Sequence, residues 1–137
     1  MNISISQKQG RVPVTVISID GRLDGQNYHE LIAKGQELYD AGTRAILLDL
    51  TNLAYVSSAG MVAFHNIALL LRGEAPPSTD QGWSTYRSMG RGSIEGGIQE
   101  NFKLFNPQPE VAHILDMVGF NTIFEIFTDL DKAVSSF

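Results

Sequence analysis

The stretch around residues 45–72 constrains the fold more than any other part of this sequence. A continuous apolar segment, residues 45–50, has the composition of a strand that is buried on both faces. A helix-length apolar segment, residues 61–72, follows, and between the two lie Ser57, Ser58, Ala59 and Gly60. Small hydroxyl residues before a helix leave side-chain oxygens and unpaired N–H groups at its start, where the helix dipole favours negative charge. The junction therefore predicts a helix cap at Ser58 or a site for a phosphate, and the two roles are compatible.

The preceding residues predict a strand, a helix and a second strand. Residues 3–5 read as a short half-buried edge strand, and residues 12–20 as a strand that ends at Asp20–Gly21, followed by a loop over residues 21–25. Apolar residues at helical spacing predict a helix over residues 27–41, with Gly42 as its stop. Gly35 lies on the apolar side of this helix, where close packing against the sheet would justify it. This order is typical of an α/β protein with a parallel or mixed sheet.

The second half of the chain resumes the pattern after an interruption. Residues 73–101 are rich in glycine and proline and exceed the length of an ordinary connection, so we expect an insertion within one domain that spans residues 1–137. A strand over residues 102–105, a helix over 111–118, a strand over 123–127 and a final helix from 129 follow. Gly90–Glu95 superficially resembles a dinucleotide fingerprint, but Glu95 occupies the place of the third glycine.

Composition excludes several classes of function. The net charge of −5 argues against nucleic-acid binding, which needs a basic surface. No apolar run has the roughly 18 residues of a membrane span, and residues 1–6 have no leader-like pattern, so we expect a cytoplasmic protein. The chain has no cysteine and no paired histidine spacing, so we expect neither a metal site nor a cofactor. Ser58 lacks a nucleophile-elbow motif and no acid–base pair stands out, so an enzyme is not expected.

Several short segments together are similar to a known family. They are Gly21–Asp24, Leu48–Leu50, Leu53, Tyr55–Gly60 and Leu115–Phe120, and the order of elements in which they stand extends the likeness over nearly the whole chain outside residues 73–101. In this order the chain resembles the STAS domain and, more narrowly, the bacterial anti-sigma factor antagonists. The resemblance implies an α/β fold with a mixed, mostly parallel sheet of about four to five strands and about four helices, mainly on one face.

The resemblance also implies a function and a set of residues. In that family the antagonist binds an anti-sigma factor and so releases a sigma factor. The anti-sigma factor is a GHKL-type ATPase that phosphorylates the serine matching Ser58, and a phosphatase is a further partner. Asp24 matches an acidic neighbour of that serine, whereas Ser57 stands where aspartate is usual. The partner-binding residues expected are Asp24, Asn52, Ser57, Ser58, Ala59, Gly60 and Met61, in a monomer or weak dimer. The alternative is a STAS scaffold or ligand-sensing module that is not phosphorylated.

Phosphorylation of Ser58 would release a bound partner for a physical reason that does not depend on the family resemblance. Phosphorylation adds about −1.5 to −2 charges, which the start of a helix accepts but an interface built around a neutral hydroxyl does not. Asp24 would add repulsion, although by itself it is equally suited to a loop or cap. Asp49 and Asn52 are equally compatible with turn chemistry and with a polar contact to the phosphate side, and Gly60 suggests close backbone approach.

Overall fold

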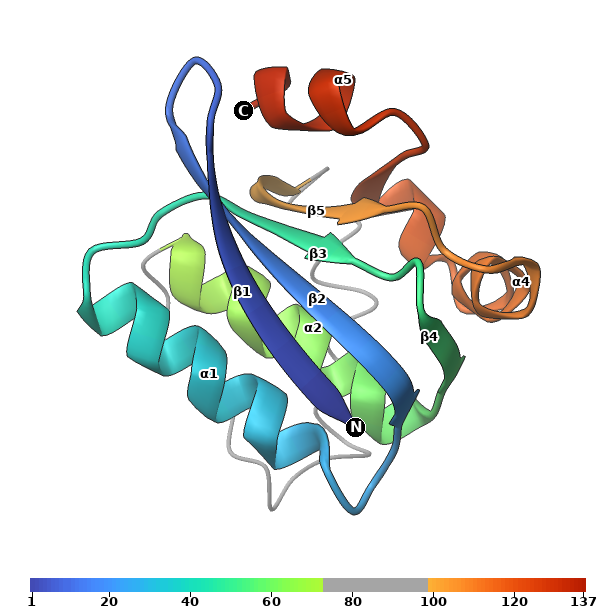
Figure 1. Ribbon diagram of the computed structural model, residues 1–137. Coiled ribbons are helices and arrows are strands. Elements are labelled where there is room, and N and C mark those ends of the chain that lie inside the picture. Colours follow the sequence, from blue (N-terminus) through green and yellow to red (C-terminus); the bar gives the residue numbers. More distant parts are fainter. Residues whose placement is uncertain (73–98) are drawn as a thin grey trace.

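The computed structural model describes residues 1–72 and 99–137, which form a sheet with helices on both of its faces (Figure 1). Segment 90–95 lies outside the described residues, as does the expected insertion up to residue 98. Residues 99–101 belong to a strand rather than to an insertion. In chain order the elements are β1 (Asn2–Gln9), β2 (Pro13–Leu23), α1 (Tyr28–Asp40), β3 (Ile46–Asp49), β4 (Leu53–Val56), α2 (Ser58–Leu71), β5 (Gln99–Phe105), α4 (Pro109–Met117), the 3₁₀ turn η2 (Phe120–Thr122), β6 (Phe124–Phe127) and α5 (Leu130–Ser135).

The sheet is mixed and mostly parallel, as the sequence predicted. Its order is β1-β2-β3-β5-β6, and β4 pairs with the end of β2 beside this path. Of the strands in the described residues, only β1 is antiparallel to its neighbour, with which it forms a regular hairpin from Asn2 opposite Asp20 to Gln9 opposite Pro13. Within the described residues the sheet has six strands rather than four to five. The additional strand is β4, which the sequence pattern did not predict.

Strand β2 does not end at Asp20–Gly21, and residues 21–23 are not part of a loop. At Gly21, where φ is +108°, the pairing register shifts and the strand exchanges β3 for β4 as its neighbour. Arg22 then lies opposite Tyr55, and Leu23 opposite Val56. A glycine is suited to this position because a side chain would be strained at that φ. The loop before α1 therefore begins only at Asp24.

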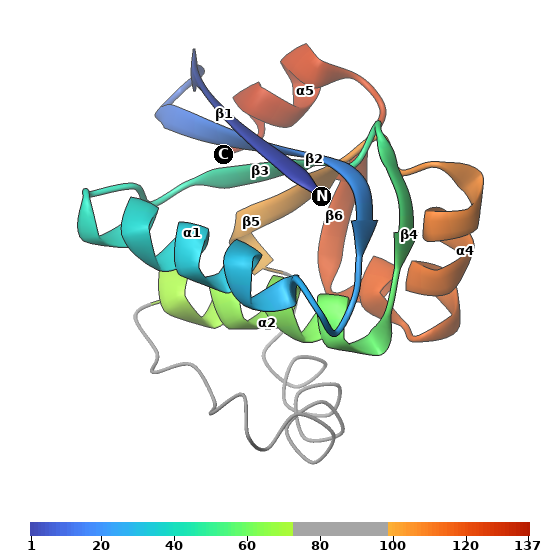
Figure 2. The same cartoon turned by 60° about the horizontal axis from the view of Figure 1, so that its bottom comes forward.

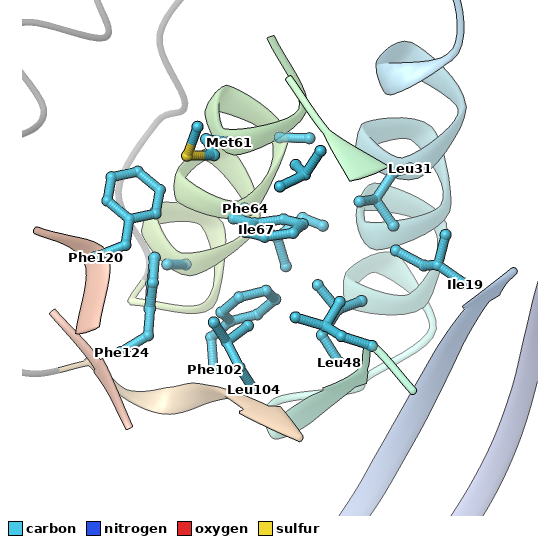
Figure 3. Close-up of a cluster of buried hydrophobic side chains, with 14 of the residues drawn as sticks. Ile19, Leu31, Leu48, Met61, Phe64, Ile67, Phe102, Leu104, Phe120 and Phe124 are labelled. Carbon is cyan, nitrogen blue, oxygen red and sulfur yellow. The ribbon is translucent and has the colours of Figure 1, made fainter. Parts of the chain in front are cut away.

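Two apolar clusters fill the two sides of the sheet. The larger lies between the sheet and helices α1, α2 and α4 (Figure 3). Within it the Phe124 ring meets two other rings edge-on, with centroids 5.3 Å from Phe120 and 5.4 Å from Phe102. The smaller lies under α5 on the opposite face, where Ala133 and Val134 pack against Val14, Val16 and Leu47 (Figure 2). As expected for its composition, α2 is buried around most of its circumference.

Gly35 faces a helix and not the sheet, contrary to expectation. A Cβ at this position would lie 2.7 Å from Cγ1 of Ile67 in α2, which is closer than side-chain atoms approach. The glycine therefore sets how closely α1 packs on α2. Gly42, with φ +106°, follows the last residues of α1 and ends that helix as predicted.

A buried lysine fixes α5 to the sheet. The Lys103 side chain on β5 is nearly inaccessible, and its ammonium donates to the backbone oxygen and to Oγ of Ser136, both at 3.0 Å. Glu125 on β6 completes the pairing at 3.3 Å. Because an unpaired buried charge would be strongly unfavourable, these contacts make the position of the C-terminal helix specific.

Candidate functional site

The candidate site is the junction between β4 and α2, where Ser57 rather than Ser58 caps the helix. Ser57 has extended backbone angles (φ −91°, ψ 175°), and its Oγ accepts a hydrogen bond from the Gly60 N–H at 3.2 Å. Its carbonyl accepts from the Met61 N–H at 3.0 Å. The cap predicted at Ser58 is wrong by one residue, because Ser58 already has a helical position.

Ser58 is the first residue of α2 and is half-buried. Within residues 1–72 and 99–137 its hydroxyl makes no hydrogen bond. The N–H groups of Ser58 and Ala59 likewise have no acceptor among the described residues, as is usual for the first turn of a helix. Ser57 thus caps the helix start, and the Ser58 hydroxyl beside it has no partner within the described part of the chain.

The loop that holds Asp24 lies directly beside this junction. Leu23 and Val56 are opposite each other on parallel strands, and the Ser57 N–H donates to the Leu23 carbonyl at 2.9 Å. Asp24 and Ser57 therefore follow the paired ends of two neighbouring strands. Because Leu23 and Val56 point inward, the alternation of strand side chains directs Asp24 and Ser57 outward.

Asp24 also organises its own loop. One carboxylate oxygen accepts from the Gln26 N–H at 3.0 Å, and its carbonyl accepts from the Tyr28 N–H at 3.0 Å. The Asn27 side chain closes the loop by accepting from the Asp24 N–H and donating to the Arg22 carbonyl, each at 2.9 Å. The structural role of Asp24 is thus real, and its other carboxylate oxygen makes no hydrogen bond to the described residues.

Sequence reasoning gave Arg22 and Tyr55 no role at this site. They are register partners on β2 and β4, and the guanidinium carbon lies 4.5 Å from the centroid of the tyrosine ring. Both side chains share the outward face with Asp24 and Ser57. The signal that could have revealed them is the alternation of Arg22 with Asp24, but it requires knowing that β2 extends to Leu23.

Asn52 does not belong to the site. It precedes β4, whereas Ser57 follows it, and a strand of this length separates the two by about 16 Å. Its carbonyl accepts from the Gly21 N–H at 3.1 Å. Its predicted place at the site is wrong because residues 53–56 form a strand, which carries the chain away from Asn52. Asp49 has turn chemistry, accepting from the N–H and Oγ of Thr51 at 3.0 and 2.6 Å.

Gly60 and Met61 are buried, so the structure does not support their direct contact with a partner. Met61 is 3% exposed and belongs to the larger apolar cluster. A Cβ on Gly60 would lie 2.8 Å from Cγ2 of Val56 and 2.9 Å from Cγ of Leu23. Gly60 therefore allows α2 to begin close to the ends of β4 and β2. Of the small residues after Ser58, only Ala59 remains half-exposed.

In residues 1–72 and 99–137, no three His, Asp or Glu side chains are grouped so that they could bind a metal ion. No helix in the same ranges is long and apolar enough to span a membrane. His65 in α2 is buried, and desolvation, together with the charge of Arg72, lowers its pKa from 6.5 to about 4.

Comparison with known proteins gives the family of this chain. The sequence profile of the STAS domain matches residues 5–74, slightly more than half of the 137 residues, and the chain belongs to this family. No curated protein matches the sequence.

Solved structures with the same fold include several antagonists. One, described as a putative anti-sigma factor antagonist from Thermotoga maritima, is 17% identical with a TM-score of 0.61, covering 96% of this chain and 90% of that one. An anti-sigma factor antagonist from Mycobacterium paratuberculosis is 17% identical with a TM-score of 0.59, covering 98% and 93%. Phosphorylated SpoIIAA from Bacillus is 15% identical with a TM-score of 0.51, covering 96% of each chain. At these identities the likeness establishes the shared fold.

Proposed function

We propose that this protein is an anti-sigma factor antagonist of the cytoplasm, which binds an anti-sigma factor and is switched off by phosphorylation of Ser58. The observation that carries the proposal is the hydroxyl of the half-buried Ser58, which makes no hydrogen bond to the described residues and stands beside a helix start that Ser57 already caps. Phosphorylation at this position removes no structural hydrogen bond. SpoIIAA, which shares this fold, has been solved in both a phosphorylated and an unphosphorylated form, and this supports phosphorylation as the kind of switch proposed here.

The local electrostatics support a switch that leaves the fold intact. The unpaired N–H groups at the start of α2 and the helix dipole stabilise a negative group there. The added charge of about −1.5 to −2 therefore does not threaten the helix itself. Its effect falls instead on whatever covers the hydroxyl.

The partner surface comprises the outward side chains around Ser58, namely Asp24, Ser57 and Ala59, with Arg22 and Tyr55 beside them. A partner that buries the neutral hydroxyl at little desolvation cost would have to bury an unpaired charge after phosphorylation. Such burial costs several kcal/mol, and each ~1.4 kcal/mol weakens binding about tenfold. The Asp24 carboxylate adds like-charge repulsion at the same place.

The partner expected is an anti-sigma factor that is itself a GHKL-type kinase, with a phosphatase to reverse the reaction. The test is to incubate the protein with ATP and such a kinase from the same organism, and to locate the phosphate by mass spectrometry. We expect the phosphate on Ser58. Ser57→Ala should still be labelled, whereas Ser58→Ala should not. Tight binding of the kinase without labelling, or labelling elsewhere, would contradict the proposal.

One observation favours a second candidate, a ligand-sensing module. A surface hollow of about 570 Å³ lies at the end of the sheet where β2 and β3 begin, and Thr15, Thr43, Arg44 and Phe137 are among its lining residues. This function predicts saturable binding of a small molecule with NMR shifts at Thr15 and Thr43. Shifts confined to the residues around Ser58 on addition of the kinase support the switch instead.

A further inference from the structure

Strand β1 forms one edge of the sheet (Figures 1 and 2). Almost all of its residues are exposed. Of its residues only Ile3 is half-buried, and the others are exposed. Ile5 is 38% exposed although it lies opposite Ile17, which is fully buried. An outer strand with open backbone groups is a ready template for another strand.

The hydrogen bonds of β2 reveal which groups of β1 are open. The Thr15 N–H donates to Ala45 and the Gly21 N–H to Asn52, so odd-numbered residues of β2 point away from β1. In an antiparallel hairpin the residues opposite them likewise point away from the shared ladder. These residues are Ile3, Ile5 and Gln7, whose backbone N–H and C=O groups therefore face the open edge.

The usual protections of an edge strand are nearly absent here. Residues 2–9 contain no proline, and the hairpin register runs without a bulge. Lys8 is the single charged side chain on the strand. Natural proteins protect long exposed edges with prolines, bulges and charges, because such edges otherwise associate.

We propose that β1 pairs antiparallel with β1 of a second copy of this chain, about a two-fold axis at Ile5. In this register Ile5 faces Ile5 of the second copy, and Ile3 faces Gln7. The open backbone groups of these residues then form about six hydrogen bonds, and the exposed Ile5 side chains bury each other. The two six-stranded sheets become one continuous sheet.

Charge complementarity favours a second copy over an unrelated strand. The same register sets Lys8 of one copy opposite Asn2 of the other, and Asn2 lies opposite Asp20 on β2. Lys8 and Asp20 of the second copy thus share one face, two strands apart, with Cα atoms about 10 Å from each other. Their side chains span this distance. Both residues are exposed, and the two-fold axis produces the ion pair twice.

A charge-reversal series tests the register directly. Sedimentation velocity over concentrations up to ~1 mM measures the dimer dissociation constant. Lys8→Glu and Asp20→Lys should each raise it about tenfold, because attraction becomes repulsion at two symmetric places, and the double variant should restore the parent value. A parent that stays monomeric throughout, or a double variant as weak as the single ones, would overturn the proposal.

A backbone substitution provides the second test. Ile5→Pro removes an N–H that faces the open edge and leaves the ladder with β2 intact, whereas Ile5→Val keeps that N–H. We expect the dimer to be lost with proline and retained with valine, with similar circular dichroism for both. A proline variant that dimerises as well as the parent contradicts the pairing. If that variant does not fold, the charge-reversal series still decides.

Discussion

Ser57 and Ser58 are adjacent, chemically identical and different in what they do. The Ser57 side chain satisfies a backbone N–H of α2, whereas the Ser58 hydroxyl has no partner among the described residues. Sequence alone identified the pair but assigned the cap to the wrong member. The difference depends on where β4 ends, because one residue more or less in the strand changes which serine has extended backbone angles.

Alanine substitutions of the two serines should therefore have different effects on the free energy of unfolding. Ser57→Ala should lower the free energy of unfolding by about 1 kcal/mol, because the Gly60 N–H loses its acceptor. Ser58→Ala removes no hydrogen bond within the described structure and should change stability by less than ~0.5 kcal/mol. Urea denaturation of both variants measures this, and equal losses would contradict the assignment of the cap.

Two glycines near the site, Gly60 and Gly25, differ in how closely other atoms approach them, so alanine substitutions at the two positions test the close packing of Gly60. Gly60→Ala should destabilise by about 1–3 kcal/mol, because its Cβ would overlap the Val56 and Leu23 side chains. Gly25→Ala, in the loop after Asp24, meets no atom within 4 Å and should be neutral or slightly stabilising. Thermal unfolding compares the two, and a Gly60→Ala variant as stable as the parent would be inconsistent with this packing.

At the scale of elements, the helices were predictable and one strand was not. The helical spacing of apolar residues located α1, α2 and α4 to within a few residues. Strand β4 escaped detection because its buried residues, Leu53 and Val56, are three positions apart and do not alternate. The register shift at Gly21 is the cause, since Leu53 pairs with Gly21 but Tyr55 already pairs with Arg22. The irregular pairing interrupts the alternation within β4, and this short strand therefore carries no periodic signal.

The contact between α1 and α2 gives a prediction at this scale. Gly35→Ala should destabilise by about 1–3 kcal/mol because the new methyl group overlaps Ile67. In the Ile67→Ala background the same substitution should cost much less, since the opposing side chain is gone. A double-mutant cycle by urea denaturation measures the coupling, and additive effects would rule out the contact.

At the scale of the whole molecule, the order of elements was predictable because apolar strands and amphipathic helices alternate along the chain. What the sequence could not supply was their three-dimensional pairing. Nothing in it indicates that Lys103, a charged residue within a strand, is buried and contacts Ser136 and Glu125. Nor does it indicate that the Asp24 loop lies beside Ser57, because that proximity depends on β2 exchanging β3 for β4.

His65 links the global stability to pH. Its pKa is about 4 in the folded chain and about 6.5 when unfolded, so the unfolded state binds the proton more readily. The contribution of the neutral imidazole to the free energy of unfolding is fully present above pH 6.5 and is lost as the pH falls towards 4. Between pH 7 and pH 5 the free energy of unfolding should drop by about 2 kcal/mol from this group. Urea denaturation at several pH values should show that the free energy of unfolding depends less on pH in His65→Leu than in the parent. An unchanged dependence on pH would contradict the burial of a neutral imidazole.

The account as a whole depends on the surface around Ser58 being covered by a partner that a charge displaces. The most direct measurement is the affinity of the anti-sigma factor kinase, by calorimetry, for the protein with phosphoserine incorporated at position 58. Phosphoserine at Ser135, an exposed residue of α5 on the opposite face of the sheet, is the control of equal charge. We expect binding at least about tenfold weaker than to the parent for position 58 and unchanged for position 135. Equal affinity for the parent and the protein phosphorylated at position 58 would contradict the account.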